Sequence, residues 1–273
     1  MKFSIIIPTY SASKTLEKAL NSVSNQNYSD YEIMVVDGGS TDGTQKILKE
    51  YEEKFAGRLR WRSEKDKGVY DAMNKGIDLA RGEWIYFLGS DDALHSNKVL
   101  EKVTEAIKRN NPDVVYGNVM WGETGKIYDG RFSVLKLMRK NICHQAIFFK
   151  RDVFQKFGKY NLKYKVLADH VFNMRWFNDD NVKKKYINFT IANYSLDGQS
   201  SASSSPDEEF TKDRDELMKK YFPKSCVAFD KERCQNEKLQ RVVREFDLLK
   251  PTKFWKWLYY FLRIKSLFFK NHS

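Results

Sequence analysis

Trp84-Ile-Tyr-Phe-Leu-Gly-Ser-Asp-Asp92 is an aromatic and aliphatic run that ends at a glycine and continues at once into two carboxylates. The run is typical of a buried strand. In an open α/β sheet, ligands bind in the crevice outside the carboxyl ends of the strands. Neighbouring carboxylates there suit a hard divalent cation that also binds phosphate oxygens. The alternative interpretation is a solvated turn that caps the next helix, because Asp is a good turn and N-cap residue.

The same strand-then-helix pattern precedes and follows this stretch. Apolar runs rich in β-branched residues predict strands, and apolar residues at helical spacing predict the helices between them. This alternation is the signature of a doubly wound, mostly parallel central sheet, so the predicted fold class is α/β. The predicted strands are 3–7, 32–36, 59–63, 84–88 and 114–117, and the predicted helices are 14–24, 43–51, 69–80 and 98–108.

Residues that suit a nucleotide follow other strands of the predicted sheet. Pro8-Thr9-Tyr10 ends the first strand, because proline cannot continue a central ladder, and leaves a loop with a hydroxyl and an aromatic ring. Asp37 lies at the end of the second strand, where a carboxylate can accept from a nucleobase N–H or a ribose hydroxyl. Asp66 lies in a charged loop on the same predicted edge, where it is either solvated or reaches a ligand.

The composition is that of a globular protein with an anionic partner. The 273 residues are 41% hydrophobic and 31% charged, which permits one large domain or one domain with an appendage. No apolar run reaches the roughly 18 to 20 residues that cross a bilayer, so we expect the chain in the cytosol. Its three cysteines lack metal-binding spacing and are expected to be reduced structural thiols. The net charge of +12 indicates nucleic acid, an acidic membrane face or a phosphorylated substrate.

Four motifs together carry a family resemblance. Ser4-Ile-Ile-Ile-Pro-Thr-Tyr10, Val35-Val-Asp-Gly-Gly-Ser-Thr-Asp-Gly-Thr44 and Phe87-Leu-Gly-Ser-Asp-Asp92, in this order and at this spacing, resemble the family 2 glycosyltransferases with a GT-A fold. Asp66-Lys-Gly-Val-Tyr-Asp-Ala-Met-Asn-Lys-Gly76 resembles the bacterial polysaccharide branch of that family. The resemblance covers roughly residues 1–205. The chain departs from the family at Gly38 and Ser90, where an acidic residue is common.

The resemblance implies roles for the residues at the strand ends. Asp92 would bind Mg²⁺ or Mn²⁺, and Asp91 would approach the ribose of the donor. The base and ribose of a nucleotide-diphosphate sugar, expected to be a UDP-sugar, would be held by the remaining residues of these motifs, which are Pro8, Thr9, Tyr10, Asp37 and Asp66.

The second half of the chain is expected to supply the group that activates the acceptor, because direct displacement at an anomeric carbon needs one base on the acceptor hydroxyl. Asp169 begins a predicted helix and is either an N-cap or an exposed reactive carboxylate. Family 2 enzymes carry the base in an equivalent segment, and this resemblance favours Asp169 as the catalytic base. His144 and His170 are more often packing residues, but both are candidates for the acceptor site.

The C-terminal part reads as a separate extension. We predict a GT-A domain over 1–205, with a nucleotide-binding half at 1–117 and an acceptor half at 118–205, and a helical extension over 206–273. The polar segment 195–206 is either a linker or a lid over the donor. Residues 251–270 mix aromatic and basic side chains without an acid, which predicts binding to an anionic membrane surface, although a helix docked on protein is the alternative.

The expected function is an inverting glycosyltransferase of bacterial capsule or O-antigen assembly. It would move a sugar to a hydroxyl of a saccharide or lipid-linked saccharide acceptor, in the cytoplasm and peripherally on the inner face of the membrane. The other interpretations are a non-catalytic nucleotide-sugar binding module and a basic membrane-binding or nucleic-acid-binding protein. Nucleic acid is not the expected partner, because the hydrophobic density of the tail exceeds what phosphate contacts require.

Overall fold

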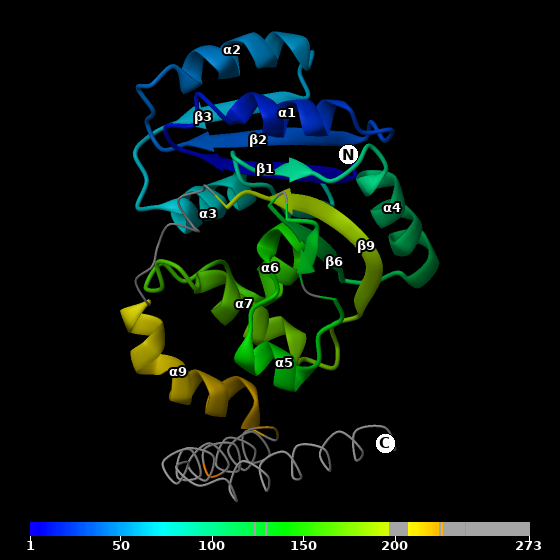
Figure 1. The fold of residues 1–273 in the computed structure, drawn as a ribbon, viewed down its shortest axis with the longest axis vertical. Helices are drawn as coiled ribbons and strands as arrows, with labels where there is room; N and C mark the ends of the chain where they lie inside the picture. The colour runs from blue at the N-terminus through cyan, green and yellow to red at the C-terminus, as the bar shows by residue number, and fades with distance from the viewer. Residues whose placement is uncertain (123, 129, 197–206, 224, 226–237, 239–273) are drawn as a thin grey trace, which may run out of the picture. The chain divides into compact units, whose positions relative to one another are not determined.

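The computed structural model describes residues 1–122, 124–128, 130–196, 207–223, 225 and 238 (Figure 1). The chain forms two compact units, Met1–Phe222 and Pro223–Ser273. Almost all of the second unit, including the basic tail at 251–270 and its predicted membrane contact, lies outside the described residues. The segment 197–206, predicted to be a lid or a linker, lies outside them too.

The first half of the larger unit alternates strands and helices, as the sequence pattern predicts. Each strand except Leu59–Ser63 is a short, mainly apolar run, and each of the first two helices buries one apolar stripe, such as Leu16, Ala19, Leu20 and Val23 of the first. The elements in chain order are β1 (Phe3–Thr9), α1 (Leu16–Ser24), β2 (Tyr31–Asp37), α2 (Thr44–Lys54), β3 (Leu59–Ser63), α3 (Val69–Leu79) and β4 (Trp84–Phe87).

The simple alternation of strands and helices ends after the strand Val114–Trp121, and a hairpin follows. β6 is longer than its predicted range and turns back into β7. The elements in order are β5 (Ala93–Leu94), α4 (Val99–Asn110), β6 (Val114–Trp121), β7 (Lys126–Tyr128), α5 (Val134–Arg139), the 3₁₀ turn η1 (His144–Ala146), β8 (Ile147–Lys150), α6 (Arg151–Phe157), α7 (Ala168–Phe177), β9 (Lys184–Tyr194) and α9 (Glu208–Tyr221).

All strands join one mixed, mostly parallel sheet in the order β3-β2-β1-β4-β8-β6-β9-β5, with β7 paired to β6. β1 to β4 are parallel, β8 is antiparallel to β4 and to β6, and β6 is parallel to β9. The pairings therefore point β6 and β9 in the same direction as β1 to β4. The carboxyl ends of these six strands meet at one edge of the sheet, which is where an α/β sheet binds ligands.

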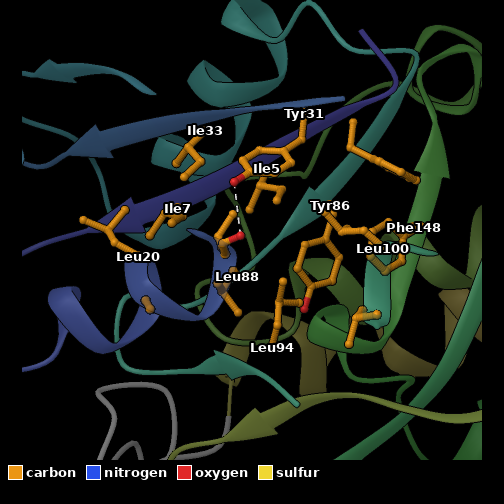
Figure 2. Packing of buried hydrophobic residues seen from close by; sticks show 14 of the residues in the cluster. Ile5, Ile7, Leu20, Tyr31, Ile33, Tyr86, Leu88, Leu94, Leu100 and Phe148 are labelled. Carbon is orange, nitrogen blue, oxygen red and sulfur yellow. Dashed lines mark hydrogen bonds between the residues drawn. The ribbon is translucent and has the colours of Figure 1, made fainter. Parts of the chain in front are cut away.

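The core lies on both faces of this sheet. α1 and α2 cover one face of β1 to β3 and α3 covers the other (Figure 1). The larger cluster combines Ile5, Ile33 and Tyr86 of the strands with Leu20 of α1 and Leu100 of α4 (Figure 2). Met34, Val36 and Ala72 form the smaller cluster under α3. Burying these apolar side chains holds the carboxyl edge of the sheet rigid.

Candidate active site

The nucleotide residues predicted from the sequence meet at the carboxyl edge. Tyr10 follows β1, Asp37 ends β2, and Asp91 and Asp92 follow β4, which pairs with β1. The backbone N–H of Gly38 donates to the Thr9 carbonyl over 2.9 Å, so the ends of β1 and β2 stay joined. Parallel pairing thus gathers side chains that are far apart in the sequence.

Asp37 is a fully buried carboxylate with a fixed orientation. One of its oxygens accepts from the Ser40 backbone N–H over 3.0 Å and from the Ser63 hydroxyl over 2.6 Å. The Ser40 hydroxyl donates to the other oxygen. These donors replace the water that a buried carboxylate loses, which lets it remain at the strand end without a charged partner.

Tyr10, Gly38 and Asp66 form a narrow slot. A Cβ on Gly38 would lie 2.7 Å from Asp66 Oδ2 and 3.2 Å from Cδ2 of the Tyr10 ring, so the close approach requires glycine. Tyr10 is 56% exposed and offers a flat ring to a base. Pro8 and Thr9 are buried within β1, and the Thr9 hydroxyl donates to the Ile7 carbonyl. These two residues therefore shape the slot through their backbone.

Asp91 and Asp92 converge on Gly89. A Cβ on this glycine would lie 2.4 Å from Asp92 Oδ2 and 2.9 Å from Asp91 Oδ1. Asp92 is buried, and it accepts from the Gln145 amide over 2.7 Å and from the Ser195 backbone N–H over 2.8 Å. Burial, and after it the neighbouring Asp91 carboxylate, raises the pKa of Asp92 to about 6.

This pair of carboxylates fits a divalent cation. Two hard oxygen donors reach one point above Gly89, and a cation there would relieve the repulsion that raises the pKa of Asp92. Among the described residues, no group of three or more His, Cys, Asp or Glu side chains gathers as a metal site. Phosphate oxygens and water would therefore have to complete the coordination, as is usual for Mg²⁺.

Asp169 lies in the first turn of α7 and is 6% exposed, so the sequence-based idea of an exposed carboxylate is wrong in this detail. Its Oδ1 accepts from the Tyr70 hydroxyl over 2.9 Å and from the His170 backbone N–H over 2.8 Å. Its Oδ2 lies 3.3 Å from His144 Nδ1. The carboxylate is therefore held by α3, α7 and η1 at once.

The two histidines differ in their surroundings. The His144 ring lies 3.3 Å from Asp169 Oδ2, and the next residue, Gln145, donates to Asp92. The His170 ring is turned elsewhere, because its Nε2 lies 2.7 Å from the Leu137 carbonyl and the ring stacks on Phe210. Burial lowers the pKa of His170, which keeps its ring neutral. The structure brings His144 to the site and gives His170 a packing position.

Two residues at the site had no predicted role. Tyr70 lies in the motif that begins at Asp66 and reaches Asp169 from α3, and Gln145 reaches Asp92 from η1. The available signal was the position of Tyr70 inside the quoted motif, near the start of the predicted helix 69–80. The sequence contains no signal for Gln145 beyond its position next to His144. Only the folded structure shows its hydrogen bond to Asp92.

Removing the Tyr70 hydroxyl is expected to slow transfer and leave donor binding unchanged. Tyr70→Phe deletes one hydrogen bond to the carboxylate, and a hydrogen bond to a charged group contributes about 1.5 to 3 kcal/mol, so kcat should fall at least about tenfold. Tyr160→Phe is the matched control, because the buried Tyr160 ring packs on Tyr70 at 5.3 Å, whereas the hydroxyl that donates to Asp169 is that of Tyr70. Equal kcat values for the two variants would contradict a role for Tyr70.

Comparison with known proteins gives the family. Residues 4–184 match the family described as Glycosyl transferase family 2. This chain belongs to glycosyl transferase family 2. It is 42% identical over 212 residues to a PGL/p-HBAD biosynthesis glycosyltransferase of Mycobacterium bovis and of Mycobacterium tuberculosis, which covers 77% of this chain and 82% of the relative. It is 30% identical over 168 residues to the glycosyltransferase AglE of Haloferax volcanii, which covers 58% of this chain and 55% of the relative.

Solved structures show the same fold at low identity. S. aureus TarS 1-349 in complex with UDP-GlcNAc has a TM-score of 0.68 at 21% identity and covers 80% of this chain and 65% of its own. The mannosyltransferase PcManGT from Pyrobaculum calidifontis in complex with GDP-Man and Mn²⁺ has a TM-score of 0.59 at 16% identity, over 93% of this chain and 82% of its own.

The predicted family and fold class are therefore confirmed. The chain is a nucleotide-sugar-dependent family 2 glycosyltransferase with a GT-A fold. None of the described helices has both the length and the apolar character needed to cross a bilayer.

Proposed function

We propose that this family 2 enzyme is an inverting glycosyltransferase that moves a sugar from a UDP-sugar to a hydroxyl of a lipid-linked saccharide in surface polysaccharide assembly. The observation that carries the proposal is the placement of Asp169. Its carboxylate is oriented by Tyr70 and bonded to His144, and the residue after His144, Gln145, donates to Asp92. A single-displacement reaction requires one oriented base, placed next to the site that would bind the leaving group through Asp91 and Asp92.

The nucleoside of the donor would occupy the slot between β1 and β2. The exposed Tyr10 ring gives the base a stacking surface, and Asp66 Oδ2 lies beside that ring to accept from a base N–H. Asp37 would accept a further hydrogen bond from the ribose or base once the slot opens, because in the free protein this carboxylate is fully buried and bonded to its hydroxyl and backbone donors. Pro8 and Thr9 would form the wall of the slot.

The diphosphate would lie beside the turn at Gly89, against which the Asp91 and Asp92 carboxylates pack so closely that a Cβ would not fit. Asp92 would hold Mg²⁺ or Mn²⁺, and Asp91 would approach the ribose from the same turn. When bound, the cation would neutralise charge on the departing diphosphate. Gln145 and the Ser195 N–H keep the Asp92 carboxylate turned toward this point.

Asp169 would take the proton of the acceptor hydroxyl as that oxygen attacks the anomeric carbon from the face opposite the leaving group. The Tyr70 hydroxyl carries one hydrogen and lies 2.7 Å from the Val166 carbonyl and 2.9 Å from Asp169 Oδ1. It can donate to Asp169 while that carboxylate is charged. Once Asp169 is protonated, Tyr70 can donate to Val166 and accept from Asp169, so both states of the base keep a partner.

A lipid-linked acceptor is supported by the charge of the chain, because a net charge of +12 suits an enzyme that works at an anionic membrane surface. The basic aromatic residues 251–270 of the proposed extension 206–273 would bind the inner face of the cytoplasmic membrane. The proposed catalytic domain is 1–205.

The donor class can be tested by thermal unfolding with UDP, GDP, dTDP and CDP, each with and without Mn²⁺. We expect UDP to give the largest rise, because a ligand at about 100 times its dissociation constant stabilises the native state by about 2.7 kcal/mol. Asp66→Ala should reduce the rise, and Asp78→Ala, which removes an exposed carboxylate on α3, should not. A larger rise with another nucleotide would replace UDP, and no rise with any would contradict the donor proposal.

A further inference from the structure

The segment that leads into α7 is held by side chains from other helices. We call residues 158–167, between α6 and α7, the α6–α7 loop. From α3, the Tyr70 hydroxyl lies 2.7 Å from the Val166 carbonyl. Asn74, one turn later on the same helix, exchanges two hydrogen bonds with the Tyr160 backbone, over 2.9 and 3.0 Å. The loop that presents the proposed base is therefore anchored on α3.

A second hold on this loop comes from Asp207, the residue that precedes α9. Its Oδ2 accepts from the Val166 N–H over 2.9 Å and from the Leu167 N–H over 3.1 Å. Its Oδ1 accepts from the Phe210 N–H over 3.1 Å and so caps α9. Capping accounts for only one of the two oxygens, because the other binds backbone 41 and 40 positions earlier in the chain.

The Asp207 carboxylate is built into the structure rather than solvated. The residue is 8% exposed, and its three backbone N–H donors replace the water that a buried carboxylate loses. A hydrogen bond to a charged acceptor is stronger than one between neutral groups, so these donors are held firmly. Leu167, the residue before α7, has no side-chain oxygen with which to cap that helix. The start of α7 is therefore fixed from outside, by α9.

One peptide group is held at both of its ends. The peptide between Val166 and Leu167 has its carbonyl 2.7 Å from the Tyr70 hydroxyl, and its N–H donates to Asp207. Because a peptide group is planar, fixing its oxygen and its N–H fixes its orientation. Asp169 lies only two residues further along the chain, and its Oδ1 accepts from the same Tyr70 hydroxyl.

We propose that Asp207 is a positioning residue for sugar transfer, which acts through the Val166–Leu167 peptide on the carboxylate of Asp169. The inference rests on the proposed function, because it takes Asp169 as the base. Without the Asp207 carboxylate, this peptide would keep only its contact with Tyr70 and could rotate. The carboxylate of Asp169 would then lose its fixed position. A misplacement of about 1 Å can cost about 100-fold in rate.

The loss of this hold should leave α9 itself in place. The Phe210 ring of α9 is buried and stacks on His170, with centroids 5.4 Å apart. It also meets the Tyr164 ring edge-on at 6.3 Å. Because α9 lies in the same compact unit as the sheet, Met1–Phe222, these ring contacts continue to dock it on α7 and the loop. The effect of Asp207 on transfer can therefore be separated from the docking of the helix.

The test substitution is Asp207→Ser in the full chain. Serine is a favoured N-cap residue, so the bond to Phe210 can be kept, whereas its one oxygen lies too close to its own backbone to reach the loop as well. We expect kcat in single-turnover transfer to fall about 10- to 100-fold. The affinity for UDP should stay within about twofold of the parent value, because the lost hold concerns the base and not the donor slot.

The matched control is Asp213→Ala on the same helix. Asp213 accepts from the side chains of Lys163 and Tyr164, so this variant also removes bonds between α9 and the α6–α7 loop. It leaves the backbone next to Asp169 held by Asp207. Its kcat should therefore stay within about twofold of the parent value.

Two further readouts separate positioning from a general loosening of the fold. The amide hydrogens of Val166 and Leu167 should exchange at least about tenfold faster in Asp207→Ser, and at the parent rate in Asp213→Ala. In an Asp169→Asn background, Asp207→Ser should lower the residual kcat by less than about twofold, because no base is left to position. Independent structural damage would instead multiply the two losses.

The inference would be overturned by a parent kcat in Asp207→Ser. It would also be overturned by an equal fall in kcat with and without Asp169, or by the same fall in Asp213→Ala, since either result would indicate structural damage. Failure of the proposed function gives a different result. In that case Asp169→Asn would itself retain turnover, whatever Asp207→Ser does.

Discussion

Asp169→Asn is expected to lower kcat by about 10³-fold, because an amide cannot accept the acceptor proton and a general base contributes about 10² to 10⁴. The substitution should leave the fold intact. The remaining carbonyl oxygen of the Asn can accept from Tyr70 and His170 N–H as Asp169 Oδ1 does, and its NH₂ can donate to His144 Nδ1. The measurement is single-turnover transfer at saturating donor, together with the affinity for UDP.

The affinity for UDP should change less than about twofold in this variant, since the lost interaction is made only during transfer. Asp213→Asn is a suitable control, because Asp213 is held by Lys163 and Tyr164 on the side of α9 and should leave kcat unchanged. Turnover near the parent rate in Asp169→Asn, with UDP still bound, would rule out Asp169 as the base. Loss of UDP affinity together with turnover would instead indicate a misfolded site.

Asp92→Asn is expected to abolish transfer and to make the free protein more stable at neutral pH. The side chain is buried, and the Asn carbonyl can take the place of the oxygen that accepts from Ser195. Its NH₂ would face Gln145, whose amide can turn to present its oxygen. The cost of burying a charge disappears, while the carboxylate that would bind the cation is lost. We expect transfer to fall by at least about 10³-fold.

The stability of the parent protein should depend on pH through Asp92. Burial raises the pKa of this carboxyl from its ordinary 3.8 to about 6, so between these values the folded state binds more protons than the unfolded chain. The contribution of Asp92 to the free energy of unfolding is therefore largest below pH 4. It falls by about 3 kcal/mol as the pH rises through 6. Denaturant unfolding with a chelator present should show this fall in the parent and lack it in Asp92→Asn. The same slope in both proteins would contradict the assignment.

The sequence by itself determined the fold and the edge at which the site lies. The alternation of strands and helices follows from local patterns of apolar residues, and residues that come directly after strands must meet at the carboxyl edge once the strands are parallel. For this reason motifs and spacing alone predicted that Tyr10, Asp37, Asp91 and Asp92 lie at one edge of the sheet.

Only the tertiary structure decided which side chains touch. Tyr70 and Asp169 are 99 positions apart and Gln145 and Asp92 are 53 apart, so no local pattern predicts either contact. The packing of α7 against the edge, rather than helix capping, determines that Asp169 is buried and bonded while His170, one residue later, turns to Leu137 and Phe210. Helix and strand propensities act over a few residues, whereas burial and hydrogen-bond partners depend on the whole fold. Burial and hydrogen-bond partners therefore decide which of the adjacent residues Asp169 and His170 can act as the base.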